Sequence, residues 1–266
     1  MSNNRIQIGA STACLYPMET EKSLEEMGRL GVRYVEIFYN SPSEYQTDYI
    51  KKLKKILDHY GIEAISMHPY DSVVEPFMFF TDYERRFHDA LDQYRRYFDQ
   101  MNLLDSKFFV FHGDRYDSKF PEKMYFERFG KLNEIGQSCG ITVVQENVQR
   151  CKSREPRFIQ AMSRYLGDQV SFVLDLKQAV RGGVAPFEML DAMKGKLKHL
   201  HFNDHDQAHD CLLPGRGDFD FVELFQRLEH IDYEGYAMVE VYRRNFGEPS
   251  EIIQSIDFLK ETEKKK

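Results

Sequence analysis

The chain has 266 residues, a length that allows one large domain or two small ones. Hydrophobic residues make up 42% of the chain and charged residues 30%, a globular balance that excludes wholesale disorder. Lysine and arginine number 36 against 43 for aspartate and glutamate, so the net charge is −7, which disfavours general binding to nucleic acid.

The cysteines and the apolar runs indicate the cellular compartment of the protein. The starting segment MSNNRIQIG lacks the long apolar stretch of a signal peptide, and runs such as FFVF are too short to span a bilayer. No two cysteines form a C-x-x-C pair, so we interpret them as scattered, reduced thiols: Cys14, Cys139, Cys151 and Cys211. We therefore expect a soluble, cytoplasmic protein without membrane contact.

Short apolar runs alternate with longer amphipathic stretches from one end of the chain to the other. Eight runs are rich in Val, Ile, Phe or Tyr and have the length of a buried parallel strand: residues 6–10, 34–38, 62–67, 107–111, 141–145, 170–174, 197–202 and 237–241. After the first run, Leu24, Met27 and Leu30 share one helical face, and Gly31 follows as a stop signal. The same pattern predicts helices at 49–60 and 124–139, each followed by glycine. The aromatic segment 70–83 is interpreted as a loop and helix start that packs as core or oligomer contact.

Eight units in this length give about 33 residues per unit, the size of a βα repeat. This predicts an α/β fold, a single (β/α)8 TIM barrel over residues 1–266. The charged tail at 259–266 is expected to be a solvated, frayed helix end. The alternative, an open Rossmann-like sheet, would require G-x-G-x-x-G after the first strand, where the sequence reads STAC.

Polar residues stand where the predicted strands end. Seven of the eight runs carry an acid or a histidine at or near the carboxyl end: Glu36, His68, His112, Glu146, Asp175, His201 and Glu240. In barrel enzymes this end of the strands holds the active site. Charged groups there are costly to desolvate unless they pair with one another or bind a metal.

Two glutamates, one aspartate and one histidine at the barrel mouth form an oxygen-rich donor set that suits Mn²⁺, Mg²⁺, Co²⁺ or Zn²⁺. His201 is preferred over His199 because it lies nearer the end of the same strand face. The alternative is a network of ion pairs at the rim of the barrel, with no metal.

The order of these residues resembles the xylose isomerase-like TIM-barrel family over essentially the whole chain. That family includes sugar and sugar-phosphate isomerases and epimerases, inosose dehydratase-like proteins and abasic-site nucleases of the endonuclease IV type. The segment LLPGRGDFDF, at 212–221, resembles the family's loop after strand seven. The resemblance implies that strands five to eight supply four ligands to one divalent metal: Glu146 in VVQENV, Asp175 in FVLDLKQ, His201 in HLHFND and Glu240 in MVEVY.

The resemblance implies a divalent-metal-dependent isomerase or epimerase of a sugar, a sugar phosphate or a related polyol. The metal (Mn, Co, Mg or Zn) would polarise the substrate carbonyl and stabilise an enediolate. Glu146 and Glu240, on different sides of the mouth, would act as acid and base as well as ligands. The candidate substrate contacts are His68, His112, Gln178, Arg216 and Lys177.

One position departs from the family. Many members carry a histidine three residues after the strand-six aspartate, and this chain has Gln178 there. Glutamine donates and accepts hydrogen bonds but does not titrate near neutral pH, so proton transfer or an extra metal at this position is in doubt. Lys177 is a candidate substitute cation.

Three alternatives stay open. An abasic-site nuclease would use a three-metal cluster, but Gln178 removes one ligand and Pro-Gly-Arg stands at 214–216, where D-x-H is expected. A non-catalytic sugar-binding member would keep the barrel and lose turnover. A dehydratase of a cyclic polyol would use the same chemistry and expel a hydroxide. A small carbohydrate is the expected partner, nucleic acid is not expected, and a homo-oligomer stays open.

Overall fold

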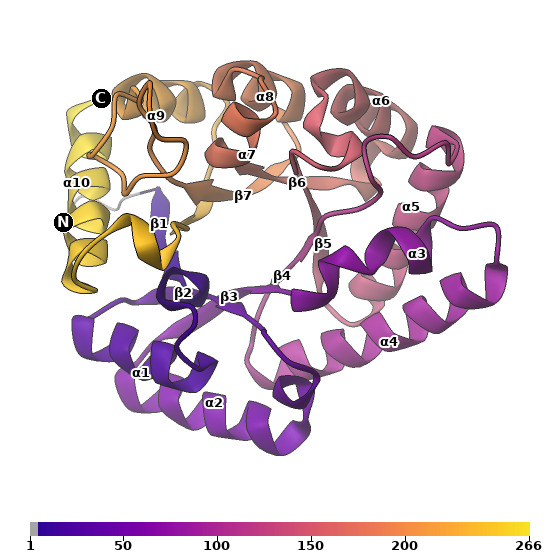
Figure 1. Ribbon diagram of the computed structural model, residues 1–266, viewed down its shortest axis with the longest axis horizontal. Coiled ribbons are helices and arrows are strands. Elements are labelled where there is room, and N and C mark those ends of the chain that lie inside the picture. The colour runs from indigo at the N-terminus through magenta and orange to yellow at the C-terminus, as the bar shows by residue number, and fades with distance from the viewer. Residues whose placement is uncertain (1–4) are drawn as a thin grey trace.

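The computed structural model describes residues 5–266, and these form a closed barrel of eight parallel strands joined by helices on the outside (Figure 1). The barrel closes where β1 pairs with β8, with Ile6 aligned to Gly235. The predicted TIM barrel is therefore confirmed. The strands are β1 Ile6–Ser11, β2 Tyr34–Phe38, β3 Glu63–His68, β4 Phe108–Phe111, β5 Thr142–Glu146, β6 Ser171–Asp175, β7 Leu197–Phe202 and β8 Gly235–Val239.

Each predicted apolar run overlaps one observed strand. Four strands, β1, β3, β5 and β6, extend one residue beyond the run, so that their last residues are Ser11, His68, Glu146 and Asp175. The eighth strand differs most: it begins at Gly235 rather than at residue 237, because Gly235 and Tyr236 pair with the start of β1. Glu240 consequently lies just after β8 and not within it.

The helices surround the barrel. The α-helices are α1 Thr20–Leu30, α2 Thr47–Tyr60, α3 Glu75–Phe79, α4 Glu84–Leu103, α5 Glu122–Ser138, α6 Pro156–Leu166, α7 Leu176–Arg181, α8 Pro186–Met193, α9 Phe221–His230 and α10 Ser250–Lys265. Short 3₁₀ helices are η1 Thr12–Leu15, η2 Pro42–Tyr45, η3 Tyr70–Val73, η4 Lys152–Arg154, η5 Gly167–Gln169 and η6 Arg243–Asn245. Gly31 ends α1 with a φ of 82°, a left-handed conformation that favours glycine. Within residues 5–266, no helix combines the length and apolar character that a membrane crossing needs.

The apolar residues form two clusters. The larger lies between the strands and the helices and includes Leu53 of α2 and Phe98 of α4. The smaller consists of Val110, Val144 and Val173 from the adjacent strands β4, β5 and β6. Side chains alternate along a strand, so each valine shares its face with the polar residue two positions later. The valines therefore form an apolar base beneath three of the polar residues at the mouth: His112, Glu146 and Asp175.

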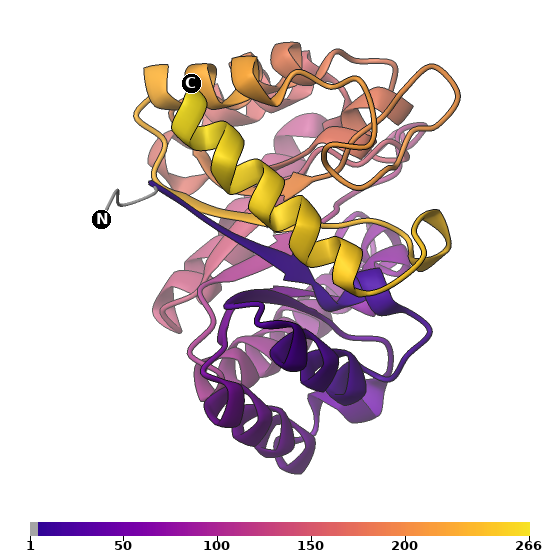
Figure 2. The ribbon, with the colours of Figure 1, turned by 90° about the vertical axis from the view of Figure 1, so that its left-hand side faces the viewer.

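The C-terminal tail is ordered, and the expectation of a frayed end is wrong up to Lys265. Helix α10 continues to Lys265 and lies against β1 (Figure 2). Thr262 and Glu263 are buried there. The Oε1 atom of Glu263 accepts a hydrogen bond of 3.2 Å from the backbone N–H of Ile6. This bond satisfies the first amide of β1, which explains why part of a highly charged tail packs against the barrel. That residues 1–266 make a single domain stays a prediction, since residues 1–4 lie outside the described part.

Candidate metal centre and active site

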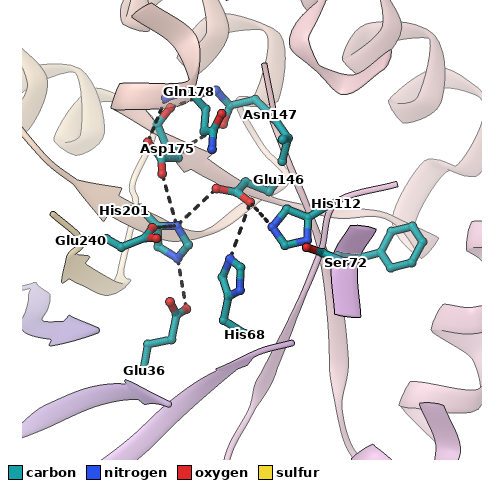
Figure 3. A network of polar contacts seen from close by, with 12 residues as sticks. Glu36, His68, Ser72, His112, Glu146, Asn147, Asp175, Gln178, His201 and Glu240 are labelled. Atoms are coloured by element: carbon teal, nitrogen blue, oxygen red, sulfur yellow. Dashed lines mark hydrogen bonds and ion pairs between the residues drawn. The ribbon is translucent and has the colours of Figure 1, made fainter. Parts of the chain in front are cut away.

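Four polar residues at the mouth of the barrel meet around one atom, the Nδ1 of His201. It lies 2.9 Å from Glu240 Oε2, 3.5 Å from Glu146 Oε1 and 3.7 Å from Asp175 Oδ2 (Figure 3). Each of the four residues offers one ligand atom, and these atoms lie within 4.8 Å of one another. The four residues come from the ends of β5, β6 and β7 and from the residue after β8. The barrel therefore brings together the set that the sequence proposed as metal ligands.

This donor set fits a divalent cation. Glu146, Asp175 and His201 are fully buried. Among the described residues, the polar groups closest to Glu146 Oε2, Asp175 Oδ2, His201 Nδ1 and Glu240 Oε2 belong to the same cluster, with His112 and Lys177 included. Three carboxylates converging on one imidazole nitrogen would repel one another without a positive charge between them. Oxygen donors with one nitrogen are the type that Mn²⁺, Mg²⁺ or Zn²⁺ binds.

The carboxylates are held in their charged form. Burial tends to raise the pKa of Glu240, but Lys177 and His201 outweigh that effect and lower the pKa to about 2. Burial likewise opposes ionisation of Glu146, yet hydrogen bonds from His112 and His201 hold its pKa well below the usual range. Both side chains are therefore ionised at neutral pH, as metal ligation requires.

Glu36 orients His201 from the side of its ring that faces away from the other candidate ligands. Its Oε2 atom lies 3.1 Å from His201 Nε2 and 3.4 Å from His199 Nε2, and it accepts a hydrogen bond of 2.8 Å from Ser66 Oγ. An ionised carboxylate only accepts hydrogen bonds, so the Nε2 of His201 carries the proton. This leaves Nδ1 facing the three carboxylates. His199, two positions earlier on β7, is fully buried beside the same carboxylate.

His68 and His112 reach Glu146 from the strands on its other side. His112 Nε2 lies 3.0 Å from Glu146 Oε2, and His68 Nε2 lies 3.9 Å from the same atom. Burial works against protonation, but hydrogen bonds to Glu146 and Glu75 raise the pKa of His112 to about 9. Burial and the charge of His112 lower the pKa of His68 to about 4. The pair thus holds one charged and one neutral imidazole, and with Glu146 it forms a second group able to hold a metal.

Lys177 lies within the centre itself. Its Nζ atom is 3.1 Å from Asp175 Oδ2 and 3.6 Å from Glu240 Oε1, and the residue is 2% exposed. Burial disfavours a charged lysine, but the two carboxylates raise its pKa well above the usual value. The sequence had placed Lys177 among candidate substrate contacts, and the structure places it between two of the candidate ligands.

Gln178 and its neighbours hold Asp175. The backbone N–H of Gln178 donates to Asp175 Oδ1 at 3.0 Å, so Asp175 also caps helix α7. Asn203 Nδ2 donates to the same oxygen at 3.1 Å, which leaves Oδ2 directed toward His201. The Gln178 side chain accepts from the N–H of Gln149, in the loop after β5.

Arg216 is the one proposed contact that the structure does not bring to the cluster. Its Nη2 atom lies 3.5 Å from Glu251 Oε2 and 3.4 Å from Gln254 Oε1, both on α10. The loop that carries it is folded around Asp204, whose Oδ2 accepts from the N–H groups of Gly215 and Gly217 at 2.9 Å each. That internal hydrogen bonding directs the arginine toward the outer helix.

Sequence reasoning missed the residues that support the ligands. Glu75 is buried and accepts from the backbone N–H groups of His112 and Gly113, at 3.0 and 2.6 Å. It stands in the aromatic segment 70–83, which the sequence presented as core. Glu36 is interpretable from the sequence as a paired structural carboxylate, but its partners His199 and His201 are not. Asn203 follows His201 by two positions on the same strand face, and that spacing was the available signal.

A parallel eight-stranded barrel with a carboxylate and histidine cluster at the carboxyl ends of its strands defines a TIM-barrel protein with a candidate active site in the usual place. The model of the xylose isomerase-like TIM-barrel family matches residues 24–262. The chain belongs to this family, as the order of its strand-end residues predicted.

Several relatives act on sugars or polyols. The chain is 21% identical over 242 residues to fructoselysine 3-epimerase of Shigella flexneri, covering 86% of this chain and 87% of the relative. It is 20% identical over 251 residues to inosose dehydratase of Clostridium botulinum, covering 83% and 81%. Among solved structures, D-allulose 3-epimerase from Methylomonas sp. has a TM-score of 0.79 at 16% identity, covering 97% of this chain and 98% of that one. These structural matches establish the fold.

Proposed function

We propose that the protein is a divalent-metal-dependent isomerase or epimerase of a sugar, a sugar phosphate or a related polyol. The observation that carries the proposal is the convergence of Glu146, Asp175, Glu240 and His201 on one point at the barrel mouth. The sugar epimerases among its relatives support the same substrate class.

The four residues would hold one metal ion, and such an ion supplies the polarisation of a carbonyl that acidifies the neighbouring C–H bond. Glu146 and Glu240 would then carry out the proton transfers. One carboxylate accepts the proton from carbon, and the conjugate acid of the other, or water, returns a proton. They come from the end of β5 and from the residue after β8, on different sides of the mouth, so they can address the two faces of one substrate. An epimerase needs both faces, whereas an aldose–ketose isomerase needs one.

A second candidate is a dehydratase of a cyclic polyol. Loss of a hydroxide from carbon requires a group that donates a proton to it. His112 fits that role, because hydrogen bonds to Glu146 and Glu75 raise its pKa to about 9 although burial opposes this. The dehydratase would share the metal ligands with the epimerase and differ in using this acid.

The first experiment is elemental analysis of the purified protein after reconstitution with Mn²⁺, Co²⁺ or Zn²⁺. We expect close to one metal per chain in the wild type and loss of it in Glu146→Ala and Asp175→Ala. The control is Asp48→Ala, because the Asp48 side chain is fully exposed on α2. A wild type that binds no metal after reconstitution contradicts the proposal.

Turnover then separates the two candidates. The metal-loaded protein is incubated in deuterated water with ketoses, ketose phosphates and cyclic polyols. Deuterium entering a C–H bond beside the carbonyl, without loss of hydroxyl, indicates an isomerase or epimerase, whereas a product lighter by one water indicates the dehydratase. If the protein is an isomerase or epimerase, the His112→Gln variant is expected to retain much of the activity. If it is the dehydratase, the same variant is expected to lose the activity.

A further inference from the structure

Lys177 is an unusual neighbour for a set of metal ligands. Its ammonium lies 3.1 Å from Asp175 Oδ2, and Oδ2 is also the oxygen that faces His201 Nδ1. Glu240 is shared in a different way: Oε1 lies 3.6 Å from the ammonium, and Oε2 lies 2.9 Å from His201 Nδ1. A metal held by the four residues would therefore share two carboxylates with a fixed positive charge.

The lysine is enclosed and has little room to move away. It is 2% exposed, and its Nζ atom lies 5.3 Å from the centroid of the Tyr242 ring. That ring is held in turn by Arg181, whose Nη1 donates to the Tyr242 hydroxyl at 2.7 Å. An unenclosed lysine side chain is long and flexible enough to place its ammonium in solvent. The enclosure of Lys177 therefore keeps its charge in the centre whether or not a metal is bound.

The charges decide what this arrangement does. Glu146, Asp175 and Glu240 carry three negative charges; the charged His112 lies against Glu146, and Lys177 is the cation that lies against Asp175 and Glu240. Glu36, a further carboxylate close to His201, is already paired with His199 and His201. A buried carboxylate without a cation is strongly destabilising, whereas a buried pair is tolerated. Lys177 therefore neutralises part of the cluster in the metal-free protein and repels an incoming cation.

We propose, on the basis of the proposed metal-dependent function, that Lys177 is a resident cation of the centre that stabilises the metal-free protein and weakens its affinity for the divalent ion. The metal is then exchangeable, and occupancy of the site follows the supply of free metal around the protein. The lysine acts on the metal through the carboxylates that they share, so it is a positioning and charge-balancing residue rather than a ligand.

The test measures Mn²⁺ affinity by calorimetry on protein stripped of metal, in the wild type, Lys177→Met and Lys177→Gln. Loss of one positive charge at this distance is expected to tighten binding by about tenfold or more in both variants. It is also expected to lower the melting temperature of the metal-free protein, so that added Mn²⁺ raises that temperature more than in the wild type. Neither readout depends on turnover.

The matched control is Lys152→Met. Lys152 is also a buried lysine, but its ammonium lies 3.7 Å from Asp114 Oδ2, a residue outside the candidate ligands. This variant is expected to lower stability with and without Mn²⁺ alike and to leave Mn²⁺ affinity unchanged. Lys177→Arg keeps the charge and is expected to bind Mn²⁺ within a few-fold of the wild type.

Two outcomes overturn the inference. Weaker or unchanged Mn²⁺ binding in Lys177→Met and Lys177→Gln would mean that the lysine positions Asp175 or has no effect on the metal. Tighter binding in Lys177→Met alone would point to a local packing effect rather than charge, since both substitutions remove the charge. A wild type that binds no Mn²⁺ is a different result, because it contradicts the metal-dependent function itself.

Discussion

The Nε2 atom of His201 lies 3.1 Å from Glu36 Oε2, while Nδ1 on the opposite side of the same ring lies 2.9 Å from Glu240 Oε2. One carboxylate therefore holds the proton on Nε2, and Nδ1 is the ring nitrogen that faces the other candidate ligands. Partners of this kind commonly change metal affinity by about 10- to 100-fold when they are replaced.

Glu36→Gln tests this relationship. The amide oxygen can replace Oε2, which Ser66, His199 and His201 all contact, but it carries no negative charge and holds the proton on His201 Nε2 less strongly. We expect Mn²⁺ binding to weaken by about tenfold or more because Nδ1 is no longer held as the free nitrogen. Calorimetric titration of metal-stripped protein measures the change. Ser66→Ala is the control, since it keeps the carboxylate and removes one donor to it; a loss of affinity as large as that of Glu36→Gln would contradict the assigned role.

Asp71 makes stability depend on pH. Burial raises the pKa of its carboxyl to about 6, although the Tyr97 hydroxyl donates to Oδ2 and favours the charged form. The pKa of an unfolded aspartate is about 3.9, so the folded protein binds more protons between roughly pH 4 and pH 6. The contribution of Asp71 to stability therefore falls as the pH rises through that window.

Asp71→Asn removes this dependence and keeps an oxygen for Tyr97. Relative to the wild type, we expect the variant to gain about 2 kcal/mol of unfolding free energy between pH 4 and pH 7.5. Urea unfolding at the two pH values measures the difference, and Asp48→Asn serves as the exposed control. A difference that stays constant with pH would show that Asp71 does not titrate in this range.

Arg128 of α5 holds the segment between α3 and α4. Its guanidinium donates to the backbone carbonyls of Phe79 and Thr81 and pairs with Glu84. It is 5% exposed, so its removal leaves buried carbonyl groups without a donor. Arg128→Met is expected to lower the unfolding free energy by about 2–4 kcal/mol.

Chemical denaturation measures this loss against Arg164→Met, an exposed arginine on α6. The control is expected to change stability by less than about 0.5 kcal/mol. Equal effects in the two variants would mean that the carbonyl contacts of Arg128 add nothing beyond a surface charge.

The barrel and its strand ends were predictable because they depend on local pattern. Alternating apolar runs and helical spacing identify βα units, and parallel strands in a closed barrel bring their carboxyl ends together. Glu146, Asp175 and His201 could therefore be placed at one mouth without any knowledge of side-chain direction.

The rest depended on contacts that the sequence does not encode locally. Glu36 and His201 are 165 positions apart and meet only because β2 and β7 face each other across the barrel. Glu75 belongs to an aromatic segment whose pattern predicts packing and gives no sign of a carboxylate that binds backbone amides. Arg216 follows the expected strand, but hydrogen bonds within its loop turn it toward α10. Direction of a loop side chain is set by such bonds and not by its position along the chain.

The pairing of β1 with β8 has a consequence for how the chain folds. Glu240 directly follows β8, and β8 is held on one side by β7 and on the other by β1, the first strand of the chain. A partly folded barrel in which β1 and β8 have not met would position the other three ligands and would hold Glu240 through β7 alone. A metal that needs all four binds the closed form far better than any open one, and it thereby shifts the equilibrium toward closure. In this barrel the cation would stabilise the pairing of the first strand with the last.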